Sequence, residues 1–382
     1  MRSLPSRTDP PRSAEAIAEN PDYLTRQLIT YIGNKRSLLD FIGQALGRVK
    51  KRLGKDKLNI LDAFSGSGVV SRYFKSHAAL LISNDLEDYA TATARCFLSN
   101  ASEVDRVAIE EAVAELNRRV VTQSFAEGFI ETLYAPRDET RITPQDRVFY
   151  TRDNARRLDR YRQLVDTAAP DCRDLLLGPL LSAASVHANT AGVFKGFYKD
   201  RRTGIGQFGG TGRDAVSRIT GQIRLQAPVL SRFDCDTLVF QQDANRLATT
   251  LRGIDLAYID PPYNQHPYGS NYFMLNLLVR YERPDEISKV SGIPKDWRRS
   301  GYNVKGRSLV LLTELLQSLD ARFLLISFNN EGFIGRDEML AMLGEIGNVE
   351  TLEAKHNAFR GSRNLAARPT HVVEQLFLVE KA

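Results

Sequence analysis

The chain of 382 residues carries 52 Lys and Arg against 46 Asp and Glu, a net charge of +6, and 42% of its residues are hydrophobic. These values suit a globular protein with one large α/β domain and an insertion, or with two domains, and a mildly basic charge is compatible with a polyanionic partner. We find no apolar run long enough to span a bilayer and no secretory segment near Met1, so we expect a cytoplasmic protein.

The N-terminal segment is expected to lead into a helix. Residues 1–22 are rich in Ser, Pro, Arg and Asp without periodicity, which predicts a mobile tail. Gly33 and Asn34 form a turn signal, and apolar residues at helical spacing follow Ser37, which we interpret as the helix N-cap. Because a helix N-terminus beside a lysine can hold an anion, Lys35 could bind the carboxylate of an amino-acid cofactor, although a surface lysine satisfies the same pattern.

A strand–turn–helix–strand pattern follows. Residues 58–68 read as a strand that ends in a glycine-rich turn, and a helix starts at Val69. The next strand, residues 79–83, ends in Asn84 and Asp85, and an acidic residue about 20 positions after a glycine turn suits the hydroxyls of a ribose. The pattern indicates half of a nucleoside-cofactor fold, and the alternative is an ordinary βαβ unit without a ligand.

From residue 89 to about residue 236 the alternation of strand and helix is lost. Residues 90–100, 108–119 and 175–188 have helical patterns. Basic residues alternate with aromatic ones, including Phe149, Tyr150 and Tyr161, and a glycine-rich stretch covers residues 203–210. Such a composition suits phosphate contact and base stacking, although a solvated face has the same composition. The candidate nucleic-acid contacts in this region are Arg156, Arg157, Lys195, Phe197, Tyr198, Lys199, Arg201 and Arg202.

The central motif begins with the apolar residues 256–259, which lead to Asp260, where Pro261 and Pro262 prevent further strand pairing. We interpret this run as a buried parallel strand whose carboxyl end faces a ligand cleft. There Asp260 and a neighbouring carbonyl could accept both N–H bonds of an exocyclic amine and favour a more nucleophilic nitrogen. Tyr263 could stack on the base in line with a methyl donor. The alternative is an ordinary loop after a strand.

The remaining segments complete a sheet. Residues 237–243 read as a strand closing on Asp243, a position suited to bind a cofactor adenine amine. The polar residues 284–306 are either a second DNA-facing loop or a disordered linker. A strand covers residues 322–328, and we expect a closing antiparallel pair at residues 349–354 and 371–379, with basic Arg360 in the loop between them. Helices are expected at residues 272–281 and 308–319.

Four motifs in this order resemble those of the S-adenosylmethionine-dependent adenine-specific DNA methyltransferases of restriction–modification and Dam-like systems, in their α-ordered class. They are Tyr31-x-Gly33-x-Lys35, Phe64-x-Gly66-x-Gly68, Asn84-Asp85 and Asp260-Pro261-Pro262-Tyr263. The resemblance covers roughly residues 26–88 and 236–380, and residues 327–332 and 374–378 also resemble family signatures. Asn34 departs from the glycine of many relatives, but asparagine also tolerates left-handed conformations.

The resemblance implies residue roles. Tyr31 and Lys35 would contact the methionine end of the cofactor, Asp85 its ribose and Asp243 its adenine amine. The further pocket residues would be Asp62, Phe64, Ser65, Gly66, Gly68, Leu86 and Ala244, and the residues that hold the target base would be Asp260, Pro261, Pro262 and Tyr263.

The resemblance also implies an architecture. We expect a doubly wound, Rossmann-like class I methyltransferase sheet, with residues 23–88 and 237–382 forming the catalytic domain. Residues 89–236 would be an inserted, mostly helical target-recognition region.

The expected reaction is methylation of the 6-amino group of adenine in duplex DNA by base flipping, with S-adenosyl-L-methionine as cofactor and S-adenosyl-L-homocysteine as product. Cys96, Cys172 and Cys235 lack metal-ligand spacing, so we expect a reducing compartment and no metal. We also expect a monomer, with a cognate restriction endonuclease as a candidate partner. The open alternatives are methylation of the cytosine 4-amino group in DNA, of adenine in RNA or of a protein glutamine amide, and a non-catalytic DNA-binding module.

Overall fold

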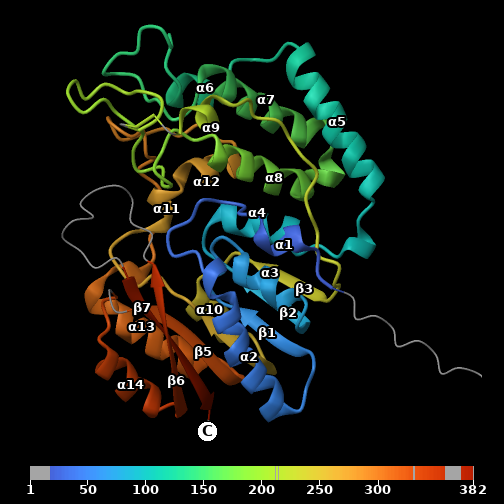
Figure 1. Cartoon of the computed structure of the whole chain (residues 1–382), viewed down its shortest axis with the longest axis vertical. Coiled ribbons are helices and arrows are strands. Elements are labelled where there is room, and N and C mark those ends of the chain that lie inside the picture. The colour runs from blue at the N-terminus through green and yellow to red at the C-terminus, as the bar shows by residue number, and fades with distance from the viewer. Residues whose placement is uncertain (1–17, 211, 214, 330–331, 358–370, 382) are drawn as a thin grey trace, which may run out of the picture.

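The computed structural model describes residues 18–210, 212–213, 215–329, 332–357 and 371–381. Figure 1 shows a lower lobe built on one sheet and an upper lobe of helices. The sheet strands are β1 (Leu58–Asp62), β2 (Ala78–Asn84), β3 (Asp236–Phe240), β4 (Ile254–Ile259), β5 (Ala321–Asn329), β6 (Gly347–Asn357) and β7 (His371–Lys381).

The sheet has the order β3-β2-β1-β4-β5-β7-β6. The strands β3, β2, β1, β4 and β5 are parallel to their neighbours, whereas β7 runs antiparallel between β5 and β6. This arrangement confirms the predicted α/β fold with a closing antiparallel pair, and it is consistent with a class I methyltransferase. The order reverses between β1 and β4, so a crevice is expected at the carboxyl ends of these two strands.

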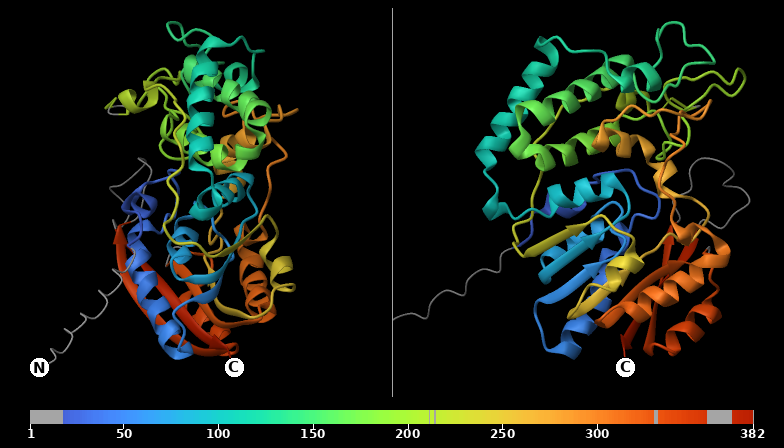
Figure 2. Two further views of the ribbon diagram at one scale, coloured as in Figure 1. Left: turned by 90° about the vertical axis from the view of Figure 1, so that its right-hand side faces the viewer. Right: turned by 180° about the vertical axis from the view of Figure 1, so that it is seen from behind.

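Helices cover both faces of the sheet (Figure 2). The helices are α1 (Pro21–Thr25), α2 (Leu39–Leu53), α3 (Val69–Lys75), α4 (Asp88–Phe97), α5 (Arg106–Thr122), α6 (Phe129–Tyr134), α7 (Arg152–Ala168), α8 (Arg173–Val186), α9 (Val216–Thr220), α10 (Ala244–Ala248), α11 (Tyr268–Asn271), α12 (Phe273–Arg280), α13 (Lys305–Ser318) and α14 (Arg336–Gly344), with 3-10 turns at Arg36–Leu38, Ala101–Glu103, Pro170–Cys172 and Gly301–Asn303. Alternate strand residues separate two cores: Leu256 packs with α2 and α3, and Ala257 packs with α10, α13 and α14. A strand buried on both faces explains the unbroken apolar run before Asp260.

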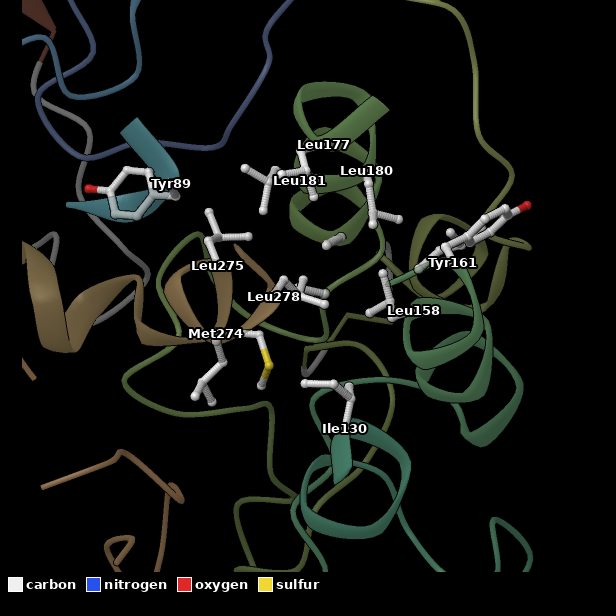
Figure 3. Packing of buried hydrophobic residues seen from close by; sticks show 14 of the residues in the cluster. Tyr89, Ile130, Leu158, Tyr161, Leu177, Leu180, Leu181, Met274, Leu275 and Leu278 are labelled. Atoms are coloured by element: carbon white, nitrogen blue, oxygen red, sulfur yellow. The ribbon is translucent and has the colours of Figure 1, made fainter. Parts of the chain in front are cut away.

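The upper lobe is assembled from two separate parts of the chain. Helix α12, which follows the Asp260 motif, packs in one apolar cluster with α4, α6, α7 and α8. Figure 3 shows side chains of α12 pointing at those of the neighbouring helices, among them Met274, Leu275, Leu278, Leu177, Leu180, Leu181, Leu158, Ile130 and Tyr89. The upper lobe therefore contains α12, which lies outside the predicted insertion of residues 89–236, so the chain after the catalytic motif contacts both lobes.

Three local expectations differ from the structure. Helix α2 begins at Leu39 after a 3-10 turn, so the Ser37 N-cap is wrong; Asn34 Oδ1 instead accepts the Arg36 N–H at 2.8 Å. The tail does not extend to residue 22, because Glu19 accepts hydrogen bonds from Ser231 Oγ and the Arg232 N–H.

The third difference concerns residues 284–306, where the disordered-linker interpretation is wrong. Ile287 and Pro294 form an antiparallel bridge, and Tyr134 Oη donates a 2.7 Å hydrogen bond to the Gly292 carbonyl. The segment therefore lies against the upper lobe. The prediction failed because its polar composition hides these tertiary contacts.

Candidate active site

A cleft opens at the carboxyl ends of β1, β2, β3 and β4 and receives nearly all predicted cofactor-binding residues. Those lining it are Tyr31, Lys35, Asp62, Phe64, Ser65, Gly66, Asp85, Leu86, Asp243, Ala244 and Asp260, joined by Pro262 of the catalytic motif. Gly68, Pro261 and Tyr263 do not line the cleft; Gly68 precedes α3, and Pro261 and Tyr263 follow β4 beside it. Residues from distant parts of the chain thus share one cleft.

The glycine-rich turn after β1 is held against β2 by hydrogen bonds. Gly66 and Gly68 have φ of +52° and +74°, a region that favours glycine. Asp85 Oδ2 accepts the Gly66 N–H at 2.8 Å, and its Oδ1 accepts the Glu87 N–H at 2.9 Å. A Cβ at Gly66 would lie 2.9 Å from the Tyr31 hydroxyl. Glycine is therefore required at position 66 both for the backbone conformation and because the Tyr31 ring packs closely against the turn.

Asn84 joins the ends of three strands beneath this turn. Its Nδ2 donates to the carbonyls of Ala63 and Gln242, both at 3.1 Å, and its Oδ1 accepts the Gln242 N–H at 3.1 Å. The side chain is 1% exposed. The Asn84-Asp85 pair at the end of β2 therefore fixes the geometry of the cleft, with Asn84 acting on the strands and Asp85 on the glycine turn.

Acidic side chains in the cleft have perturbed pKa values. Burial raises the pKa of Asp62 to about 7, although Ser71 Oγ donates a 2.6 Å hydrogen bond to its Oδ2. The other oxygen of Asp62 is buried and has no hydrogen-bond partner within the described part of the chain. Burial also raises the pKa of Glu87 to about 7, reinforced by Asp85. The cleft thus holds acceptor groups that a cationic ligand could satisfy.

At Asp260, a buried lysine stands beside the carboxylate. Lys35 Nζ lies 3.3 Å from Asp260 Oδ1 and 2.7 Å from Glu374 Oε1, and Lys35 is 4% exposed. The surface-lysine interpretation is therefore wrong. Burial raises the pKa of Asp260 to about 6, with Lys35 opposing and Glu374 reinforcing the shift. Asp260 is thus ionised at neutral pH but close to its titration range.

Aromatic rings form the wall between the lobes. Tyr31 is stacked on Tyr272 with ring centroids 4.7 Å apart and on Tyr268 at 5.1 Å. Tyr263 lies outside this stack, tilted against Phe328 at 5.6 Å. The wall was not predicted, although Tyr268 and Tyr272, four residues apart at helical spacing, could have indicated part of it.

Other cleft residues were also missed. They are Glu87, Tyr268, Arg298, Ser300, Tyr302 and Asn303. Asn303 Nδ2 donates a 2.7 Å hydrogen bond to the Asn264 carbonyl, directly after the catalytic motif. Residues 298–303 therefore connect the cofactor cleft with the loop that carries Tyr263. The sequence indicated this segment only as part of a polar loop over residues 284–306, without a role in the cofactor cleft.

The candidate nucleic-acid contacts fall into two groups. In the first group, the exposed side chains are those of Lys195, Lys199, Arg201 and Arg202. They lie on the upper-lobe segment before the glycine-rich stretch of residues 203–210, where Tyr198 is half-buried. In the second group, Arg156 pairs with Glu131, Arg157 pairs with Asp153, and Phe197 is buried with its ring edge-on to Phe149. Arg360 lies outside the described residues.

The aromatic residues 149, 150 and 161 were interpreted as base-stacking groups, and this is wrong. All three side chains have no exposed surface because they build the core of the upper lobe.

The described helices include none with the length and apolar character needed to cross a membrane. Within the same residues, no cluster of three metal-ligating side chains occurs.

The chain is similar to known DNA methyltransferases. A family model described as D12 class N6 adenine-specific DNA methyltransferase matches residues 31–326. The chain is 28% identical over 360 residues to the type II methyltransferase M.CviAII of Paramecium bursaria Chlorella virus 1, covering 92% of this chain and 98% of that protein. It is 26% identical over 364 residues to M.NlaIII of Neisseria lactamica, covering 91% and 100%. Modification methylase StsI of Streptococcus sanguinis is 26% identical over 92% of this chain and 52% of its own length.

Proposed function

Because this chain belongs to the D12 class of N6 adenine-specific DNA methyltransferases, we propose that it methylates the adenine 6-amino group in duplex DNA with S-adenosyl-L-methionine, releasing S-adenosyl-L-homocysteine. The observation that carries the proposal is Asp260 at the end of β4, in the same cleft as the glycine turn and Asp85. We further propose a cytoplasmic monomer that acts as the modification enzyme of a restriction–modification system beside a cognate endonuclease. The names type II methyltransferase and modification methylase of its relatives support the modification role.

The residues of the cleft fit the proposed cofactor. Gly66 lines the cleft with a backbone conformation that favours glycine, so the backbone of the turn can approach a ligand, and the unpartnered buried oxygen of Asp62 suits the cationic methionine end. Asp85 is assigned to the ribose, where its oxygens retain lone pairs beyond the two backbone bonds. Asp243 caps α10 by accepting the Arg246 N–H at 3.1 Å, and its second oxygen is assigned to the adenine amine.

Methyl transfer requires the protein to orient the target amine and to position the target base. When bound, S-adenosylmethionine supplies an activated methyl group on a positively charged sulfur. Asp260 orients the target amine and stabilises the positive charge that develops on nitrogen as the nitrogen–carbon bond forms and the carbon–sulfur bond breaks. The nitrogen then loses one proton, which Asp260 is assigned to pass to solvent. Tyr263 is assigned to stack on the base, and Pro261 and Pro262 restrict the backbone between these two side chains.

The 6-amino group lies inside the double helix, so the base must leave the stack to reach the cleft. We propose that the upper lobe selects the target, with residues 89–236 as the recognition region and residues 23–88 and 237–382 as the catalytic domain. The exposed cations Lys195, Lys199, Arg201 and Arg202 are assigned to phosphates.

The test is incubation with unmethylated genomic DNA and methyl-labelled cofactor, followed by digestion to nucleosides. Label in 6-methyladenine is the expected result, and mapping the same DNA identifies the target site. Asp260→Ala should abolish transfer while circular dichroism shows an unchanged fold. Label in 4-methylcytosine would overturn the base assignment, and label only on RNA or on protein would overturn the DNA assignment.

A further inference from the structure

The Lys35 ammonium lies between two carboxylates, the buried Glu374 and the partly exposed Asp260, and the proposed reaction uses only Asp260. Lys35 Nζ is 2.7 Å from Glu374 Oε1 and 3.3 Å from Asp260 Oδ1. Glu374 and Lys35 are each 4% exposed. The shorter contact therefore belongs to the carboxylate that lies outside the catalytic motif.

Glu374 reaches this position because β7 is antiparallel to β5. It is paired with Asn329 at the carboxyl end of β5, the same sheet edge that holds Asp260. Ser327 Oγ donates a 3.1 Å hydrogen bond to Glu374 Oε1, so the carboxylate has a second partner besides Lys35. A buried charge with two polar partners is held in one geometry, and this holds the ammonium in place as well.

The three ionised groups carry one positive and two negative charges. A lysine paired with Asp260 alone would neutralise that carboxylate and compete with the target amine for its lone pairs. The cluster therefore has a net negative charge. Because the ammonium lies closer to Glu374, this net negative charge is located mainly on Asp260. In a site that is largely removed from water, this charge interacts strongly with a positive nitrogen.

We propose that Glu374 is a positioning residue for methyl transfer: it acts through Lys35, drawing the ammonium toward itself so that Asp260 keeps its negative charge for the target amine. The inference rests on the proposed function, since it assigns a role within that reaction. Glu374 touches neither the substrate nor the reacting atoms in this assignment.

The pH dependence of the reaction reports on this arrangement. Activity requires ionised Asp260, and the Glu374 charge contributes to the raised pKa of Asp260. Removing that charge should lower the Asp260 pKa and move the acid limb of the rate profile to lower pH. The other titratable groups around the cluster are Asp62, Tyr258, Tyr263 and Tyr268. The pKa of Asp62 also lies near neutral pH. Every variant compared here retains Asp62, so its contribution to the pH profile is the same in all of them.

The experiment measures single-turnover methylation of DNA across pH for the wild type and Glu374→Gln. The expected plateau rate of the variant is about 10- to 100-fold lower, while its acid limb lies about one pH unit lower. A lower rate at neutral pH combined with better retention of activity in acid is not expected from a merely structural defect. Glu374→Met, neutral and of similar volume, serves as a second neutral variant should the amide fail to fold.

Two further variants control for charge and position. Glu374→Asp keeps the charge but shortens the side chain, so its acid limb should match the wild type while its plateau falls. Glu353→Gln neutralises a carboxylate on the neighbouring β6 that lies away from the cleft, and its profile should match the wild type. Neutral variants with an unshifted acid limb would overturn the inference. A wild-type enzyme without activity on adenine would instead overturn the proposed function.

Discussion

Arg298 Nη1 lies 2.7 Å from Asp88 Oδ2 and donates a further hydrogen bond to the Leu86 carbonyl at 3.1 Å. Both arginine contacts are to the segment that follows β2, where Asp85 also lies. Arg298 belongs to the ordered segment after α12 and lines the cofactor cleft together with Leu86. The contact between Arg298 and Asp88 therefore holds the segment after α12 against the end of β2, and this closes one side of the cleft.

Replacing Arg298 should weaken cofactor binding more than folding. Arg298→Ala removes two hydrogen bonds from a partly exposed site, so we expect a loss of about tenfold in affinity for S-adenosylmethionine, measured by calorimetry. Arg280→Ala is the matched control, since Arg280 Nε contacts the same Asp88 oxygen at 2.7 Å but does not line the cleft. An equal loss of affinity in both variants would show that the arginines act only through Asp88.

The sequence predicted the parts of the site that short stretches of chain determine. The glycine turn, Asp85 and the Asp260 motif each follow a strand, and parallel strands bring their carboxyl ends to one edge. Glu374 and Arg298 were not assigned because their places depend on an antiparallel strand and on a loop held by tertiary contacts. Phe149 and Tyr161 were misassigned because a base-stacking ring and a core ring look alike in sequence.

The ring of Tyr263 should matter more than its hydroxyl. Stacking of an aromatic side chain on a base contributes about 1–3 kcal/mol, so Tyr263→Ala should lower kcat/KM by about 10- to 100-fold. Tyr263→Phe keeps the ring and should remain close to the wild type. Steady-state rates on a single-site duplex provide the measurement, and equal losses in the two variants would assign the effect to the hydroxyl.

Two helical glycines should respond to alanine in opposite directions. A Cβ at Gly178 of α8 would lie 2.6 Å from Cys96 Sγ on α4, whereas a Cβ at Gly47 of α2 meets nothing within 4 Å. Gly178→Ala should therefore destabilise the protein by about 1–3 kcal/mol through overpacking. Gly47→Ala should stabilise it by about 0.5–1 kcal/mol, because glycine is a poor helix former. Urea unfolding of both variants tests the pair, and a stabilised Gly178→Ala would contradict the close α4–α8 contact.

The cofactor-free protein should lose stability as the pH rises from about 6.5 to about 8. Burial raises the pKa of Asp62 and of Glu87 to about 7, so the folded state binds more protons than the unfolded state in this interval. Stability then falls with increasing pH. Burial lowers the pKa of His77 to about 4, so this histidine makes stability rise with increasing pH. That contribution applies only below its unfolded pKa of about 6.5, outside the interval considered.

Glu87→Gln isolates one of these two groups. The amide cannot ionise, and its oxygen can still accept the hydrogen bond that Asn276 Nδ2 donates to Glu87 at 2.6 Å. The variant should therefore unfold with a shallower dependence of Tm on pH across the same interval. Glu286→Gln is the matched control, because Glu286 is exposed and its pKa is lowered by Lys295, so it stays ionised throughout. A Tm that rises between about pH 6.5 and about pH 8 would mean that the buried acids of the cleft do not carry the raised pKa values assigned to them.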